Sequence, residues 1–261
     1  MDTLQLHSAI VVKTVSEEAK RGVFEVEGLF AGYGMTIGNA LRRALLSSLQ
    51  GAAITEFKVK NAPHEFSTLP GVKEDIVELL LNFKRLRFRM HTDEPHVLAL
   101  KVKGERTVTA ADIQADAEVE LMNPEEVIAH LTSKDAELDI EIKVERGLGY
   151  SPVEARKAQG RLPIGTIAVD AIFTPVLRVN YTVDNMRVGE RTDYNRLRLE
   201  IDTDGSVSPS HALAQAVQIM KDHFEKVVGL VTVQAFEAPA VEPSEAKLVK
   251  KKAKKAKEKE E

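Results

Sequence analysis

Apolar residues recur at helical spacing in two stretches near opposite ends of the chain. The first stretch, residues 32–51, predicts a helix that Thr36 caps and that ends in a left-handed turn at Gly51. Its apolar stripe consists of Ile37, Leu41, Leu45, Ser48 and Leu49. Arg42 and Arg43 lie about 100° apart on the helical wheel, so they cannot both point along that stripe. The helix should therefore present an apolar face and, beside it, a guanidinium face. From pattern alone, a core helix with two solvated arginines explains the same residues.

The second stretch predicts a helix that Ser208 caps and that carries Pro209 at its first position. Its apolar positions are Leu213, Val217, Met220, Phe224 and either Val227 or Val228. Their alternating spacing of four and three residues is typical of a helix that packs on another helix. The two apolar stripes are explained equally well by packing within one monomer and by contact with a second copy.

Between the two helices the pattern is mostly that of strands. Strands are expected at 5–13, 22–30, 53–60, 85–90 and 138–144, with a helix at 72–83. The glycines and prolines of 146–162 indicate a long polar connection. The fold class is therefore α+β. Residues 1–51 and 171–235 would form one discontinuous domain, in which the two long helices pack on a sheet. Residues 52–170 would be an inserted strand-rich domain, and 236–261 a linker and tail.

Composition limits the classes of protein that remain. The chain has 261 residues and no cysteine, so disulfides and thiolate zinc sites are excluded. Neither a signal peptide nor an apolar run long enough to span a membrane is apparent, and no membrane partner is expected. Residues 245–261 contain eight Lys and four Glu, whereas the whole chain carries −4, so the rest carries −8. A body of that charge is not a broad nucleic-acid surface.

Candidate catalytic and ligand-binding motifs are weak. Gly32, Gly34 and Gly38 follow a strand-like run and nearly form a dinucleotide fingerprint, but the spacing is one residue too long and Glu56 falls in mid-strand. Residues 202–206, DTDGS, start like a calcium loop yet lack its later ligands, so a hairpin turn is preferred. The seven histidines show no ligand spacing, and no nucleophile lies in a recognised elbow. We therefore expect no catalytic residue, metal or cofactor in this chain.

Several ordered motifs carry a family resemblance. They are T-I-G-N-A-L-R-R-x-L-L-S-S-x-x-G at 36–51, H-E-F-S-T-L-P-G-V-K-E-D at 64–75, E-R-G-x-G-Y at 145–150, L-P-I-G at 162–165 and E-R-T-D at 190–193. Together they resemble the N-terminal domain of the bacterial RNA polymerase alpha subunit, from about residue 5 to 235. The resemblance implies a homodimer that scaffolds assembly of the beta and beta-prime subunits in the bacterial cytoplasm. It also implies a non-catalytic subunit of a nucleotidyltransferase, with Mg²⁺ only on another subunit.

The resemblance also assigns residues to contacts. The dimer interface would consist of Leu41, Leu45, Leu49, Val217, Met220 and Phe224. The beta-subunit contact would consist of Arg42, Arg43, His64, Glu65, Phe66, Ser67 and Lys84. The beta-prime contact would consist of 171–181 and the region around Arg191, Thr192 and Asp193. For Lys84 alone, a solvated charge at a helix end is the simpler interpretation.

The end of the sequence departs from the family. The alpha subunit usually continues into a small helical domain that binds upstream promoter DNA, whereas here a Pro/Ala/Glu linker at 236–246 precedes a Lys-rich run at 247–261. Either this lineage lacks that domain or the sequence is part of a longer one, so specific upstream DNA recognition is not expected. The Lys-rich run either contacts DNA weakly, by counterion release, or is a solubilising segment. Two alternatives remain: a homodimeric scaffold outside transcription, and a nucleotide-binding enzyme that uses the glycine loop.

Overall fold

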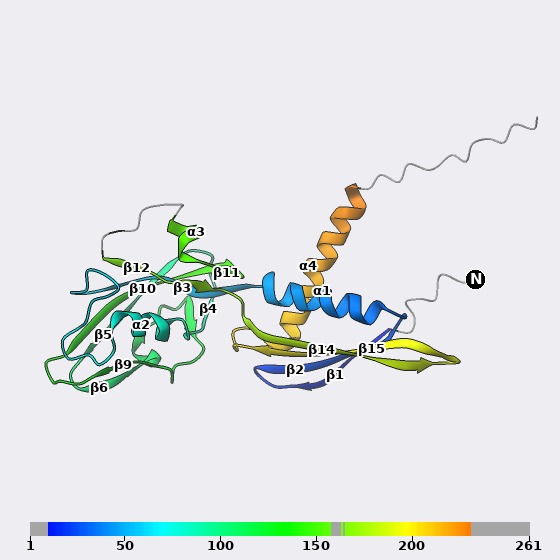
Figure 1. Ribbon diagram of the computed structural model, residues 1–261, viewed down its shortest axis with the longest axis horizontal. Coiled ribbons are helices and arrows are strands. Elements are labelled where there is room, and N and C mark those ends of the chain that lie inside the picture. Colours follow the sequence, from blue (N-terminus) through cyan, green and yellow to red (C-terminus); the bar gives the residue numbers. More distant parts are fainter. Residues whose placement is uncertain (1–9, 158–162, 164, 231–261) are drawn as a thin grey trace, which may run out of the picture. The chain divides into compact units, whose positions relative to one another are not determined.

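The computed structural model describes residues 10–157, 163 and 165–230 (Figure 1). Residues up to Asp222 belong to one compact unit, and the end of the last helix, from His223, belongs to a second. The first unit contains two main antiparallel sheets and few helices, which confirms the α+β class. The linker and the Lys-rich run expected at 236–261 lie outside the described residues. None of the helices described is long and apolar enough to cross a membrane.

The two ends of the chain build a four-stranded sheet, here called the terminal sheet. Its strands, in spatial order, are β1 (Val11–Glu17), β2 (Arg21–Leu29), β15 (Arg191–Thr203) and β14 (Val176–Val188). Leu197 of β15 lies opposite Val26 of β2, so the pairing joins distant parts of the sequence. The strand predicted at 5–13 is instead β1, which extends to Glu17; residues 5–9 lie outside the described part.

Helix α1 (Tyr33–Ser47) lies over β14 and β15 on one face of the terminal sheet (Figure 1). It packs closely because it carries glycines where it meets the strands. A Cβ atom on Gly34 would lie 2.6 Å from Val183, and one on Gly38 would lie 2.7 Å from Tyr181. These glycines therefore serve helix–sheet packing. The predicted cap at Thr36 was wrong, because the helix begins at Tyr33, after Gly32 in a left-handed conformation. The predicted terminator at Gly51 was also wrong.

Helix α4 (Pro209–Leu230) begins where the sequence predicts. Ser208 Oγ accepts a hydrogen bond from the backbone N–H of His211 at 3.4 Å, as a capping residue does. The face that packs on the terminal sheet is built on the small residues Ala212 and Ala216, both fully buried, and this face was not predicted. Small residues bring the helix backbone close to the sheet.

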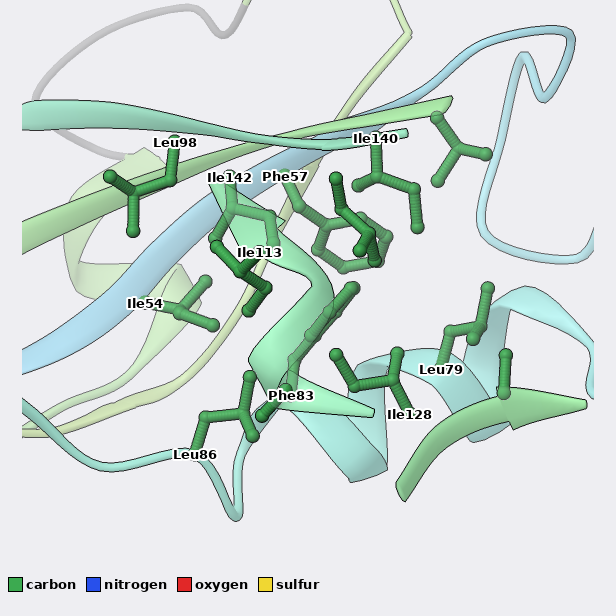
Figure 2. Packing of buried hydrophobic residues seen from close by; sticks show 14 of the residues in the cluster. Ile54, Phe57, Leu79, Phe83, Leu86, Leu98, Ile113, Ile128, Ile140 and Ile142 are labelled. Carbon is green, nitrogen blue, oxygen red and sulfur yellow. The ribbon is translucent and has the colours of Figure 1, made fainter. Parts of the chain in front are cut away.

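The middle of the chain builds a second sheet, here called the middle sheet. Its members are β7 (Ile113–Gln114), β5 (His96–Lys103), β10 (Glu137–Leu148), β3 (Gln50–Val59), β4 (Phe88–Met90) and β8 (Val119–Leu121) in that order, with β12 (Thr166–Ala168) also paired to β3. Its core includes Phe57 and Phe83, whose ring centroids lie 5.0 Å apart in an edge contact (Figure 2). All of its strands lie between Gln50 and Ala168; the predicted domain bounds stay a prediction.

Helix α2 (Ile76–Phe83) supplies Leu79 and Phe83 to this core. It begins four residues later than predicted, because Asp75 accepts a hydrogen bond from the N–H of Glu78 and so caps it. Strict alternation at 85–90 gives only the short strand β4. A two-stranded pair, β6 (Arg106–Thr109) with β9 (Val127–Leu131), and a 3-10 turn at Ala110–Asp112 complete this region.

The first part of the connection expected at 146–162 contains regular secondary structure, and residues 158–162 lie outside the described part of the chain. Strand β10 runs to Leu148, and β11 (Tyr150–Ser151) pairs with β13 (Ala171–Ile172). Helix α3 (Val153–Lys157) follows. The expectation of a loop is wrong for residues 146–157, because glycines and polar residues can also lie in short strand pairings, where context outweighs propensity.

Candidate partner-binding surfaces

Two arginines lie side by side on the outer surface of α1. Arg42 and Arg43 are exposed, whereas Leu41 and Leu45 are buried against the terminal sheet. Within the described residues neither guanidinium forms a side-chain hydrogen bond or an ion pair. The predicted separation of a guanidinium face from an apolar face is therefore present. Two unpaired planar forks on one helix are suited to carboxylates or carbonyl groups of another protein.

The position of α1 depends on Asn195, a residue that sequence reasoning missed. Asn195 Oδ1 accepts the backbone N–H of Gly32 at 2.8 Å, and its Nδ2 donates to Asn185 Oδ1 at 3.1 Å. Asn195 is buried in β15, 163 positions from Gly32. It satisfies a backbone donor at the start of the helix that no local side chain satisfies. No sequence signal near Gly32 points to it.

The segment His64–Ser67 forms a small turn that projects an aromatic side chain. The Ser67 N–H donates to the His64 carbonyl at 3.1 Å, and Ser67 Oγ lies 3.1 Å from His64 Nδ1. Phe66 is 79% exposed, and Glu65 is exposed as well. The Ile76 N–H also bonds the Ser67 carbonyl at 3.4 Å, so the turn rests on the start of α2. Phe66 therefore offers apolar surface on an anchored turn, although a single exposed apolar residue is also common on monomeric proteins.

Lys84 is already paired within the chain. Its ammonium lies 2.8 Å from Asp170 Oδ2, and Asp170 Oδ1 accepts the backbone N–H of Val153 at 3.0 Å. The hydrogen bond from Lys84, followed by that from Val153, holds the pKa of the Asp170 carboxyl below its usual range. The simpler interpretation of Lys84 as a solvated charge was therefore wrong. Lys84 links the end of α2 to the segment that precedes β13.

Arg191 is likewise engaged by its own hairpin. Its Nε and Nη2 donate to the two carboxylate oxygens of Asp193 at 3.1 and 2.7 Å. Its guanidinium carbon lies 5.0 Å from the ring centroid of Phe30 and 5.4 Å from that of Tyr194. Thr192 and Asp193 are exposed. The guanidinium thus organises the hairpin tip, and the hydrogen bond it gives lowers the pKa of Asp193. In 171–181, Ile172 and Leu177 are exposed.

The six residues assigned to a dimer interface fall into two groups. Leu41, Leu45 and Leu49 are at most 6% exposed and belong to the core of the chain itself, together with part of Met220. Val217 and Phe224 are 47% and 64% exposed. Sequence reasoning missed two exposed apolar residues at the start of α1, Tyr33 and Met35. Neither stands out in the sequence, because a single apolar residue at a helix start carries no periodic signal.

The calcium-like turn is closed by its own residues. Asp204 Oδ1 accepts hydrogen bonds from Ser206 N at 2.8 Å and from Ser206 Oγ at 2.6 Å, and both residues are buried. Asp202 pairs with Arg178 at 2.9 Å. Among the residues that the structure describes, no group of three or more His, Cys, Asp or Glu could hold a metal ion. The turn interpretation is favoured by these contacts.

Comparison with known proteins gives one family. Residues 55–174 match the family described as the RNA polymerase Rpb3/RpoA insert domain. DNA-directed RNA polymerase subunit alpha of Symbiobacterium thermophilum is 50% identical over 216 residues, which cover 83% of this chain and 68% of that protein. The subunits of Alkaliphilus oremlandii and Moorella thermoacetica are each 47% identical, over 221 and 226 residues. These matches cover 85% and 87% of this chain, and 69% and 72% of the two relatives.

Proposed function

Because this chain belongs to the family of bacterial DNA-directed RNA polymerase alpha subunits, we propose that it is the scaffold on which the large subunits assemble. Two copies form a dimer, one copy binds the beta subunit and the other binds beta-prime. The chain is part of a nucleotidyltransferase but contributes no catalytic residue of its own. Mg²⁺ acts on another subunit, and assembly takes place in the cytoplasm.

The observation that carries this proposal is the exposed pair Arg42 and Arg43 on a firmly held helix. Leu41 and Leu45 anchor α1 from below, and Asn195 fixes its start through Gly32. Because the helix backbone is already fixed, binding has to order only the two arginine side chains, which favours affinity. An arginine fork also gives directional hydrogen bonds that an apolar patch cannot give. Both features suit the capture of one specific subunit.

The dimer contact rests on the outer apolar side chains. Val217 is exposed on the part of α4 that belongs to the first unit, and Phe224, Val227 and Val228 are exposed on the part that belongs to the second. Several large apolar side chains exposed on one helix are typical of a surface that a partner covers. Leu41, Leu45 and Leu49 support the interface from inside the chain, because they have almost no surface left to offer. The exposed residues of α4, and not the three buried leucines, are therefore the positions at which a substitution tests the proposed dimer.

The beta-prime contact uses the exposed apolar residues Ile172 and Leu177 and the hairpin tip at 191–193. Arg191 acts there by shaping the tip, since Asp193 and two aromatic rings already occupy its guanidinium. Lys84 acts in the same indirect way, since Asp170 already occupies its ammonium. The direct beta contacts are then Arg42, Arg43 and the turn at His64–Ser67.

Co-purification with the beta subunit, followed by native mass determination, tests the proposal. We expect a complex of two copies of this chain with one beta subunit. A stable dimer that ignores beta would overturn the assembly role and favour a homodimeric scaffold outside transcription. A monomer that still binds beta would overturn the dimer instead.

A further inference from the structure

A single arginine joins the middle sheet to the terminal sheet. Arg89 lies on β4, and its Nε donates to the carbonyl oxygen of Ser206 at 2.7 Å. Its Nη2 donates to the carbonyl oxygen of Gly205 at 3.2 Å, in the same turn between β15 and α4. Its Nη1 donates to Glu120 Oε2 on β8 at 3.3 Å, which holds the guanidinium on the middle sheet. One side chain is thus bonded to two residues, Gly205 and Ser206, that lie 116 and 117 positions further along the chain.

The turn that accepts these hydrogen bonds is rigid. Asp204 Oδ1 accepts both the N–H and the hydroxyl of Ser206, and the Asp204 N–H donates to the Pro175 carbonyl at 3.0 Å. Asp204 and Ser206 are each 8% exposed. Gly205 has a φ of +97°, a conformation that glycine adopts without strain. Because the carbonyl groups are fixed, a bond to them constrains direction as well as distance.

The two sheets are also joined by the chain itself. The chain passes from α1 directly into β3, and it returns through β13 into β14. Around these passages a small apolar cluster forms from Ala53, Ala171 and Phe173. Apolar contacts of this kind are non-directional, whereas the hydrogen bonds of Arg89 have a preferred direction and so add a constraint on orientation.

We propose that Arg89 is a positioning residue that fixes the orientation of the middle sheet relative to α1. This inference rests on the proposed function, in which Arg42 and Arg43 on α1 and the turn at His64–Ser67 near α2 meet the same beta subunit. A fixed orientation lets both contacts form together, and it avoids the entropy cost of ordering two independent parts. Arg89 itself touches no partner; it acts through the junction.

The geometry distinguishes arginine from lysine at this position. Two donors of one planar group reach two consecutive carbonyl oxygens, whereas an ammonium on a flexible stem acts as a single point. Arg89→Lys should therefore keep one attachment and lose the directional constraint, which gives an intermediate phenotype. Arg89→Ala should lose both. If Arg89 contributed only to overall stability, the distances between the two sheets would be distributed equally in the parent, Arg89→Lys and Arg89→Ala.

The test uses the absence of cysteine in the chain, which makes introduced thiols unique. Spin labels at Asn39→Cys on α1 and Val97→Cys on β5, both exposed positions, report the distance between the two parts. The labelled full-length chain is diluted with unlabelled chain, so that each dimer carries labels on one copy. Arg89→Ala, Arg89→Lys and the parent are compared by the width of the distance distribution. Unlabelled versions are compared by beta-subunit binding.

Arg106→Ala is the matched control, because Arg106 forms an ion pair with Asp112 within the middle region and does not reach the junction. We expect a narrow distribution for the parent and for Arg106→Ala, and a broad one for Arg89→Ala. Beta-subunit affinity should fall on the order of tenfold in Arg89→Ala, because binding must then also order the two parts relative to each other. Arg89→Lys should lie between, and it also serves if Arg89→Ala folds poorly.

An equally narrow distribution for Arg89→Ala would overturn the positioning role. A broad distribution with parental beta-subunit affinity would overturn its contribution to assembly while leaving the proposed function intact. If the parent itself fails to bind beta, the proposed function fails, and the label distances still decide whether Arg89 fixes the orientation.

Discussion

A Cβ atom on Gly51 would lie 1.8 Å from the carbonyl oxygen of Phe173. Backbone is in contact with backbone here, at the point where the chain leaves α1 and enters β3. A flexible side chain could move aside, but Phe173 directly follows the β11–β13 pairing and its backbone N–H donates to the Gly149 carbonyl at 2.8 Å, so this backbone is held in place. Gly51 therefore ends no helix; it lets two chain passages approach each other at the junction.

Gly51→Ala should lower the free energy of unfolding by about 3 kcal/mol, at the upper end of what overpacking costs. Denaturant unfolding followed by circular dichroism measures the change. Gly229→Ala is the control, because nothing lies within 4 Å of its added Cβ and alanine favours a helix. Equal stability of Gly51→Ala and the parent would show that the junction relaxes around a methyl group.

Arg43→Ala should leave the mass of the dimer unchanged and weaken beta-subunit binding on the order of thirtyfold. The physical reason is that the partner's acceptor groups would be left buried without a donor, which costs about 2 kcal/mol or more. A binding titration with purified beta subunit measures the loss. Arg106→Ala again controls for the removal of one arginine. Parental affinity in Arg43→Ala would remove α1 from the beta contact.

Phe224→Asp should convert the dimer to monomers at micromolar concentration. Phe224 is an exposed aromatic side chain of α4, and a charge at the centre of an apolar interface raises the dissociation constant by at least about thirtyfold. Light scattering during size exclusion gives the mass. Val97→Asp, a charge placed on an exposed valine of β5, should stay dimeric. An unchanged mass for Phe224→Asp would place the dimer contact elsewhere.

Asp170→Asn should make the melting temperature depend less on pH in the acidic range. The Asp170 pKa is lowered, chiefly by Lys84, so the carboxylate stabilises the fold at pH values above the pKa of an unfolded Asp, about 3.9. That stabilisation is lost as the pH falls through the lower pKa of the folded state. The melting temperature of Asp170→Asn should lie below that of the parent at pH 5–7, and the gap should close below about pH 4. A gap independent of pH would contradict the ion-pair account.

Sequence patterns correctly predicted those features that depend on residues close together in the chain. Ser208 and Pro209 mark the start of α4 correctly, since a cap and a proline act within one turn. The start of α1 was misjudged at Thr36, because the residue that satisfies Gly32 is Asn195, far away in sequence. Nothing in residues 30–40 encodes that contact.

The same limit applies to the candidate surfaces. The apolar stripe of α1 was recognised, but periodicity cannot say whether Leu45 faces its own sheet or a second copy, and here it is fully buried in its own chain. The family resemblance predicts Arg191 as a contact of beta-prime, but it says nothing about the neighbours of Arg191 within the chain. Its neighbours include Phe30, which directly follows β2 and whose ring lies 5.0 Å from the Arg191 guanidinium carbon. Both results depend on the pairing of β2 with β15, which no local pattern contains.

That pairing also sets the order in which the chain can fold as it is made. Glu25 and Arg198 bond across β2 and β15, although 173 positions separate them. At the usual speed of translation, β2 leaves the ribosome on the order of ten seconds before its partner strand does. Every strand of the middle sheet is made within that interval. The middle sheet can therefore form while the edge of β2 that will pair with β15 is still unpaired. Because α4 is made later still, the surface that would recruit a second copy is completed last, and newly made chains would pair only after both sheets exist.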